Sequence, residues 1–243
     1  MGETKLTFKR YEKKYMLSAR DYEALFQQLE PYIEPDEYAH STVCSVYYDS
    51  EDYRLIRRSL EGPVYKEKLR LRSYNVPSPE DPVFVELKKK YKGIVYKRRV
   101  SMGAAAAADW LAGRSAPTED SQMVREIEWF LQTNRLAPRA FIACDRWAWR
   151  AREDEELRIT FDRNIRWRGE ELDLTLGDWG EALLPEGEVL MEIKIPGAAP
   201  LWLAHILSAL QLYPRGFSKY GTCYKEKILE KIFNEYNGVI THA

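Results

Sequence analysis

Residues 64–74 read VYKEKLRLRSY, and this stretch decides the predicted fold. Successive side chains of a β-strand point to opposite faces of a sheet. The apolar face of such a strand would carry Leu69 and Leu71, and the other face would carry four cations: Lys66, Lys68, Arg70 and Arg72. Lysine and arginine usually lie in water, so a solvated strand face is the simpler interpretation of this stretch taken alone.

The same alternation recurs in other stretches, and this recurrence favours a functional face. It predicts six further groups on shared strand faces: Glu86 with Lys88 and Lys90; Lys97 with Arg99; Arg10 with Glu12 and Lys14; Arg146 with Arg150; Arg158 with Thr160 and Asp162; and Glu192 with Lys194. The opposite faces are apolar enough to pack under helices. A sheet with its charges turned inward must enclose water and counter-ions, as polar-lined barrels do. The ligand is therefore expected to be a polyanion.

The predicted architecture is an α+β fold, a closed eight-stranded antiparallel β-barrel tunnel with helices packed on the outside. Strands are expected near residues 5–17, 41–49, 64–74, 82–92, 94–101, 139–150, 157–168 and 188–196. Helices are expected after the N-cap Ser18 and over residues 50–60, 103–112, 121–134, 200–211 and 219–236. No internal repeat or boundary is evident, so residues 1–243 are predicted to form a single domain.

Composition narrows the function classes. The 37 basic and 38 acidic residues nearly cancel, so local segregation of charge matters more than the net charge of −1. Cys44, Cys144 and Cys223 match no zinc or disulfide spacing, which predicts reduced thiols in a cytoplasmic chain. The sequence shows no signal peptide, no bilayer-spanning apolar run and no P-loop. Nucleic-acid binding is disfavoured because the basic side chains are expected inside the barrel.

Three carboxylates are predicted on the cationic strand faces: Glu12, Glu86 and Glu192. They could balance the charge of neighbouring lysines and arginines. They could also hold Mg²⁺ or Mn²⁺, since these hard cations bind one or two carboxylates together with substrate phosphates. Glu192 is the leading candidate for a metal ligand.

Eight motifs occur in an order that resembles the vacuolar transporter chaperone (VTC) domain, the polyphosphate polymerase family within the triphosphate tunnel metalloenzyme (CYTH-like) superfamily. They are RYEKKYML, KLRLR, FVELKKK followed by VYKRR, DRWAW, LRITFD, MEIK and FSKY, and they cover nearly the whole chain. The resemblance implies an eight-stranded tunnel that binds nucleotide triphosphate or polyphosphate, with metal held by Glu192 of the last strand. It also implies a catalytic set that contacts phosphates: Lys14, Arg70, Arg72, Lys88, Lys97, Arg146, Arg158 and Lys219.

Further phosphate-binding cations are expected around that set: Arg10, Lys66, Lys68, Lys90, Arg99, Arg150, Lys194 and Arg215. One departure concerns the opening strand, where the wider group has a Glu-x-Glu-x-Lys pattern and this chain has Arg10, Glu12 and Lys14. The missing first glutamate removes a metal ligand and weakens the case for a hydrolytic two-metal site.

The expected function is a phosphotransferase, an ATP-dependent polyphosphate polymerase that uses Mn²⁺ or Mg²⁺. The alternatives are a triphosphatase or polyphosphatase on the same fold and a non-catalytic polyphosphate sensor. The expected partners are ATP and inorganic triphosphate or polyphosphate. The chain itself is not expected to insert into a membrane, so secretion of product would need a membrane or regulatory partner protein.

Overall fold

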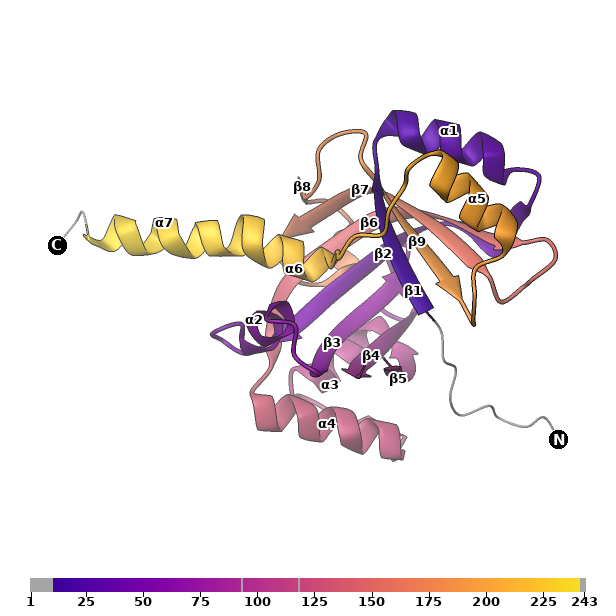
Figure 1. Ribbon diagram of the computed structural model, residues 1–243. Coiled ribbons are helices and arrows are strands. Elements are labelled where there is room, and N and C mark those ends of the chain that lie inside the picture. The colour runs from indigo at the N-terminus through magenta and orange to yellow at the C-terminus, as the bar shows by residue number, and fades with distance from the viewer. Residues whose placement is uncertain (1–10, 93, 118, 241–243) are drawn as a thin grey trace. The chain divides into compact units, whose positions relative to one another are not determined.

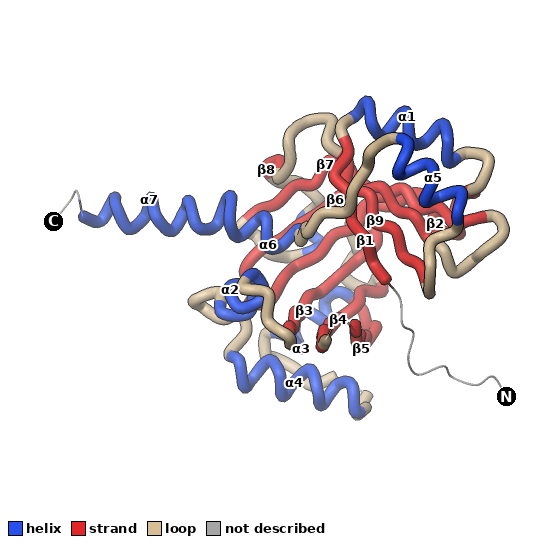
Figure 2. The backbone as a smooth tube through the Cα atoms, in the orientation of Figure 1, coloured by secondary structure: helices blue, strands red, loops and turns tan. Residues whose placement is uncertain are grey.

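The computed structural model describes residues 11–92, 94–117 and 119–240 (Figure 1). Its strands form one large antiparallel sheet, drawn in red in Figure 2. The strands are β1 (Tyr11–Leu17), β2 (Ile33–Asp49), β3 (Tyr65–Tyr74), β4 (Pro82–Tyr91), β5 (Ile94–Gly103), β6 (Ala137–Ala151), β7 (Arg158–Arg168), β8 (Glu181–Ala182) and β9 (Val189–Ile195). Their order is β1-β9-β7-β6-β2-β3-β4-β5, and β8 pairs with β7.

The helices fall where the sequence predicts them. They are α1 (Ala19–Leu29), α2 (Arg54–Leu60), α3 (Ala104–Leu111), α4 (Gln122–Asn134), α5 (Leu201–Ala209), α6 (Lys219–Cys223) and α7 (Leu229–Ile240). A π-helical turn, Tyr224–Ile228, joins α6 to α7. Ser18 caps α1 as predicted, because its side chain accepts from the amide of Asp21 and the Asp21 carboxylate accepts from the amide of Ser18.

The α+β class and the large antiparallel sheet are confirmed. All eight predicted strands are present, although residues 5–10 of the first one lie outside the described residues, and the two-residue β8 is an addition. The main difference is β2, which begins at Ile33 although the sequence predicted a strand only from residue 41. The extra residues, IEPDEYAH, are polar and contain Pro35, so local propensity gave little sign of a strand. Closure of the sheet into an eight-stranded barrel stays a prediction.

The chain divides into two compact units. The first unit comprises Met1–Ser41, Cys144–Asn164 and Leu184–Gly216, and the second comprises Thr42–Ala143, Ile165–Leu183 and Phe217–Ala243. Strands β2, β6 and β7 therefore contribute residues to both units. Each unit has its own buried core. This division does not test the prediction that residues 1–243 form a single domain.

The core of the first unit lies between the sheet and two helices. Alternate residues of β1, β7 and β9, such as Leu17, Phe161 and Met191, are buried on one face of the sheet. Helices α1 and α5 lie side by side over this face (Figure 1) and bury Leu25 and Leu203 against it. The opposite parity of the same strands carries Glu12, Lys14, Asp162 and Glu192, so burial of the apolar face fixes where these charges point.

The core of the second unit follows the same rule. Leu69, Leu87 and Val100 alternate with the charged residues of β3, β4 and β5, and all three are buried. Helices α3 and α4 supply Ala107 and Phe130 to the same core. One parity of these strands thus carries the buried apolar residues under helices, together with Glu67, Lys89 and Arg98, and the other parity forms a polar face.

This separation predicts a large stability difference between two adjacent residues of α4. Phe130 is 1% exposed, whereas Trp129 is 63% exposed. Phe130→Ala should lower the free energy of unfolding by about 3–5 kcal/mol, because a buried aromatic ring is lost. Trp129→Ala should change it by less than about 0.5 kcal/mol. Urea unfolding of the two variants measures this, and equal effects would contradict the assignment of the core.

Two further expectations concern the thiols and the membrane. Cys44, Cys144 and Cys223 are free thiols, as predicted, and all three are buried. Within the part of the chain that the structure describes, no helix is long and apolar enough to cross a bilayer. The cytoplasmic location stays a prediction.

Candidate functional site

The polar parity of β3, β4 and β5 forms a cationic face in the second unit. The strand register places Lys66 opposite Lys90, Lys68 opposite Lys88, and Lys88 opposite Lys97. Four cations come from β3, two from β4 and two from β5: Lys66, Lys68, Arg70, Arg72, Lys88, Lys90, Lys97 and Arg99. We call this set the cationic face. It brings together eight of the residues that the sequence predicted to bind phosphate.

Glu86 is the carboxylate within the register of this face, opposite Arg70 on one side and Arg99 on the other. The Nε and Nη2 atoms of Arg70 lie 2.8 and 2.7 Å from Oε2 of Glu86. The Oε1 atom of Glu86 accepts from Lys97 at 2.6 Å and from Nε of Arg99 at 2.7 Å. Burial raises the pKa of Glu86, but the charges of Arg70, Arg72 and Lys97 outweigh it and hold the pKa well below its usual range. Glu86 is therefore an anion at neutral pH.

The cations of this face exceed what Glu86 can neutralise. The pKa of Lys97 is lowered by burial, and Arg99 and Arg70 add to this effect against the attraction of Glu86. Burial would raise the pKa of Tyr47, yet Arg70, Arg72 and Lys219 lower it below its ordinary value. The pKa of Tyr47 falls in spite of burial, which is the response expected in a region of positive potential, whereas burial is the main cause of the lowered pKa of Lys97.

The start of α6 is fastened to the second unit through a buried tyrosine. Tyr220 donates to Oδ2 of Asp49 at 3.1 Å, and its ring stacks on Tyr47 with centroids 4.7 Å apart. Asp49 is fully buried and also accepts from the amides of Leu55 and Ile56 in α2. These contacts fix Lys219, the residue before Tyr220, at the first position of α6. Lys219 lowers the pKa of Tyr47, so it acts on the cationic face.

Serine residues complete the polar surroundings of this face. Lys68 donates from Nζ to Oγ of Ser218 at 2.8 Å, and Arg72 donates from Nε to Oγ of Ser45 at 3.2 Å. Lys66 donates to the Ser59 carbonyl at 2.8 Å. These bonds hold long, flexible cations in defined directions and reduce the entropy that an anion would have to remove on binding.

The polar face of the first unit has a mixed charge. Lys14 lies 3.3 Å from Glu12 and 3.2 Å from Glu192, and the register pairs Lys14 with Glu192 across β1 and β9. Arg146 holds Asp162 with two bonds, from Nε to Oδ1 at 2.6 Å and from Nη2 to Oδ2 at 2.7 Å. Burial lowers the pKa of Arg146, but Asp162 outweighs this effect and raises it, so the guanidinium stays charged. Nη2 of Arg146 is also 4.0 Å from Glu192.

The residues around Glu192 fit a divalent cation. Glu192 is 7% exposed, and the sheet register places it opposite Thr160, whose buried Oγ1 atom has no hydrogen-bond partner. Glu12 shares Lys14 with Glu192. Carboxylate and hydroxyl oxygens are the hard donors that Mg²⁺ and Mn²⁺ prefer. Within the described residues, no group of three or more His, Cys, Asp or Glu side chains is arranged for a metal, so substrate oxygens would have to complete the coordination.

Other predicted residues lie on or near the first unit's polar face. Arg158 and Lys194 are cross-strand neighbours, and Arg158 also lies 3.6 Å from Asp36. Arg150 pairs with Glu34 at 2.7 Å, and the amide of Arg215 donates to the Lys14 carbonyl at 2.7 Å. Arg10 lies outside the described residues. The predicted set is thus divided between the two units, and its phosphate-binding and metal-binding roles stay predictions.

Sequence reasoning missed Ser45 and Tyr47, which belong to the second unit's polar face through their register with Arg72 and Arg70. A signal was present, because residues 43–49 alternate and put Ser45 and Tyr47 on one parity. Tyrosine and serine carry no charge, and a search for cations passes over them.

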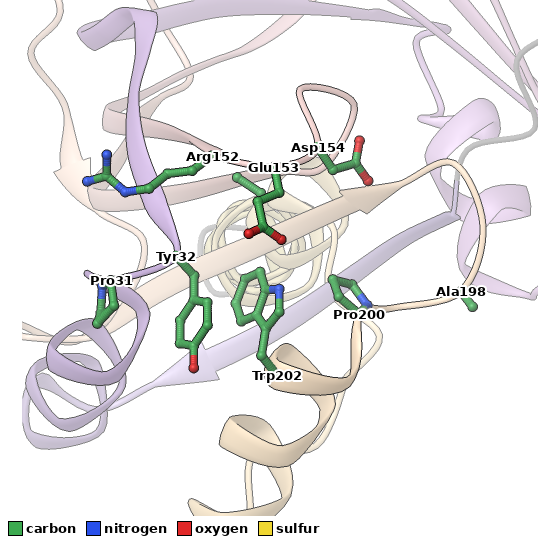
Figure 3. Close-up of a pocket in the computed structure, with 9 residues that line it drawn as sticks. Pro31, Tyr32, Arg152, Glu153, Asp154, Ala198, Pro200 and Trp202 are labelled. Atoms are coloured by element: carbon green, nitrogen blue, oxygen red, sulfur yellow. The ribbon is translucent and has the colours of Figure 1, made fainter.

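A separate hollow of about 290 Å³ lies in the first unit (Figure 3). Its wall includes Tyr32 and Trp202, whose rings are parallel with centroids 4.5 Å apart. Arg152, Glu153 and Asp154 line the same hollow. None of the cations predicted to bind phosphate is among its lining residues, so it is distinct from the cationic face.

The family of this chain follows from comparison with known protein families. Residues 9–227 match the family model of the VTC domain.

The chain belongs to the VTC domain family. The VTC domain lies within the CYTH-like tunnel superfamily, whose fold is associated with polyphosphate and triphosphate chemistry and whose members typically use divalent metals. No curated protein matches this VTC-domain chain.

Three solved structures are similar to this chain at low sequence identity, and the first of them, with a TM-score above 0.5, shares its fold. A candidate adenylate cyclase from Bacillus halodurans is 14% identical, with 88% of this chain and 94% of that chain covered and a TM-score of 0.53. A candidate adenylate cyclase from Vibrio parahaemolyticus is 12% identical, covering 88% and 96% at a TM-score of 0.47. A candidate adenylyl cyclase from Hippeastrum, described as having a dominant triphosphatase activity, is 15% identical, covering 86% and 92% at 0.46.

Proposed function

We propose that this VTC domain is a metal-dependent polyphosphate polymerase that transfers the γ-phosphoryl group of ATP to a polyphosphate chain. The observation that carries the proposal is the cationic face, where eight lysines and arginines of three adjacent strands share one face with the carboxylate Glu86. A monophosphate would satisfy only a few of these cations. A chain of phosphates offers repeated charge along the same direction and matches the repetition of cations along the strands.

The roles of individual residues follow from their donors. Arg70 and Arg72 present planar guanidinium groups, which suit phosphate oxygens, while Lys88 and Lys97 supply more compact charge. Lys219 at the start of α6 adds a further cation to this set. Lys14, Arg146 and Arg158 are proposed to contact phosphate as well. The proposal includes the closed eight-stranded tunnel that is typical of the superfamily.

Glu192, with Glu12 beside it, would hold Mn²⁺ or Mg²⁺. When bound, such an ion neutralises charge on phosphoryl oxygens. The chain's own cations hold the phosphates in line and stabilise the charge that builds up during transfer. Phosphoryl transfer depends mostly on positioning and charge neutralisation, so the reaction does not require a histidine base.

The proposed reaction balances simply. A terminal oxygen of the polyphosphate chain forms a bond to the γ-phosphorus of ATP, and the bond from that phosphorus to the β,γ-bridging oxygen breaks. The products are ADP and a chain longer by one phosphate. Passage of that chain across a membrane would require a partner protein.

Product analysis tests this proposal. The purified chain is incubated with ATP and either Mn²⁺ or Mg²⁺, and ADP, free phosphate and polyphosphate are resolved over time. Polyphosphate formed together with ADP is the expected result. Free phosphate without polymer would instead indicate a triphosphatase. Binding of polyphosphate without any turnover would indicate a sensor.

A further inference from the structure

Glu86 is surrounded by cations on the polar face of the second unit. Its side chain is only 1% exposed, although Lys97 and Arg99 beside it are 42% and 34% exposed. It forms ion pairs with residues of two different strands, Arg70 from β3 and Lys97 and Arg99 from β5, and β4 carries Glu86 between them. A single carboxylate thus links three strands through its charge.

The acceptor capacity of this carboxylate is already used. An ionised carboxylate offers about four lone-pair sites on its two oxygens. Oε2 accepts from Nε and Nη2 of Arg70. Oε1 accepts from Lys97 and from both Nε and Nη2 of Arg99. A divalent cation at Glu86 would have to displace these donors and then lie among three positive charges.

The arrangement also restricts the three cations. Nε and Nη2 of Arg70 are directed at Glu86, and Tyr47 accepts another bond from the same guanidinium. Arg99 lies over the Phe84 ring, 4.3 Å from its centroid, while it binds Glu86. Restriction of this kind is what a preorganised anion site needs, because the side chains then lose little entropy when the anion arrives.

We infer that Glu86 is a positioning residue, an internal anion that holds Arg70, Lys97 and Arg99 in place for the phosphate chain, and is not a ligand of the catalytic metal. The inference rests on the proposed function, since it specifies how the phosphate-binding cations are held. The sequence left two roles open for Glu86, charge balance and metal binding, and the inference assigns it the first.

The first test measures thermal stability in EDTA, with sodium tripolyphosphate as the anion. Glu86→Gln removes the charge and keeps the size, so the three cations repel one another in the free protein. The variant should melt at least about 4 °C below the unmodified chain. Saturating tripolyphosphate should raise its melting temperature by more than it raises that of the unmodified chain, because the ligand replaces the missing negative charge.

Glu126→Gln is the matched control. Glu126 also pairs with a lysine and an arginine of β4 and β5, Lys89 at 2.6 Å and Arg98 at 3.0 Å, but on the opposite parity of the strands. Its loss should leave the response to tripolyphosphate unchanged. If Glu86→Gln and Glu126→Gln respond alike to tripolyphosphate, the inference is overturned.

A double variant decides the question even if Glu86→Gln does not fold. Lys97→Met removes one of the three cations, and in the Glu86→Gln background it should restore part of the lost stability. A double variant that is no more stable than Glu86→Gln contradicts the inference. This comparison needs neither ligand nor turnover, so it remains decisive if the proposed function is wrong.

The last readout separates the two roles of Glu86 directly. The Mn²⁺ concentration that half-saturates the Mn²⁺-induced thermal shift should change by less than about threefold in Glu86→Gln, a free-energy difference below about 0.7 kcal/mol. An increase of tenfold or more, with an unchanged response to tripolyphosphate in EDTA, would make Glu86 a metal ligand and overturn the inference. Failure of the unmodified chain to bind tripolyphosphate would count against the proposed function instead.

Discussion

Replacing Glu192 by Gln should reduce the rate of ADP and polyphosphate formation at least about 100-fold, while tripolyphosphate binding in EDTA changes by less than about threefold. Gln keeps the size of the side chain and removes the charge that the proposed metal requires. The effect on phosphate binding should be small, because the cationic face lies on other strands and Glu12 remains within 3.3 Å of Lys14.

Steady-state rates over a range of Mn²⁺ concentrations, with calorimetric titration of tripolyphosphate, measure both parts of this prediction. Glu126→Gln is the control, since Glu126 pairs with Lys89 and Arg98 on the opposite face of the strands. Turnover unchanged in Glu192→Gln would refute the assignment of the metal ligand. A large loss of tripolyphosphate binding in EDTA would mean that Glu192 supports the anion site itself.

The second large effect is expected in the double variant with Arg70→Ala and Arg72→Ala. Its affinity for tripolyphosphate should fall about 100-fold or more, because each guanidinium supplies charge-assisted hydrogen bonds of about 1.5–3 kcal/mol. The dependence of affinity on salt concentration should also become shallower, since fewer charges are neutralised on binding. Calorimetric titrations at several NaCl concentrations measure both quantities.

Arg98→Ala provides a matched comparison for this variant. Arg98 belongs to β5, next to Arg99, but its guanidinium pairs with Glu126 on the opposite parity. Its replacement should change tripolyphosphate affinity less than about threefold. Equal losses in the two variants would show that general positive charge, and not the cationic face, determines binding.

The sequence was sufficient to predict which residues share a face. Strand alternation has an invariant period of two, so residues 64–74 already separated Arg70 and Arg72 from Leu69 and Leu71, and the register agrees. The physical reason for this success is that the apolar parity is buried under α3 and α4. A shift of the strand register by one residue would bury the charges instead.

Other features depended on contacts between distant segments. The start of β2 at Ile33 could not be read from a polar stretch containing Pro35, because pairing with other strands and not local propensity makes it a strand. The saturation of Glu86 by three cations required the positions of β3 and β5 on either side of β4. The Tyr220 bond to Asp49 joins residues 171 positions apart, and no sequence pattern marks it.

The most direct test of the polymerase is a stoichiometry. The chain is incubated with Mn²⁺, a tripolyphosphate primer and ATP labelled with ³²P at the γ-phosphate, and the label in polymer, the label in free phosphate and the ADP are quantified. We expect one labelled phosphate in polymer for each ADP released, and this yield should depend on Glu192. Labelled free phosphate equal to the ADP, with no label in polymer, would contradict phosphoryl transfer to a growing chain.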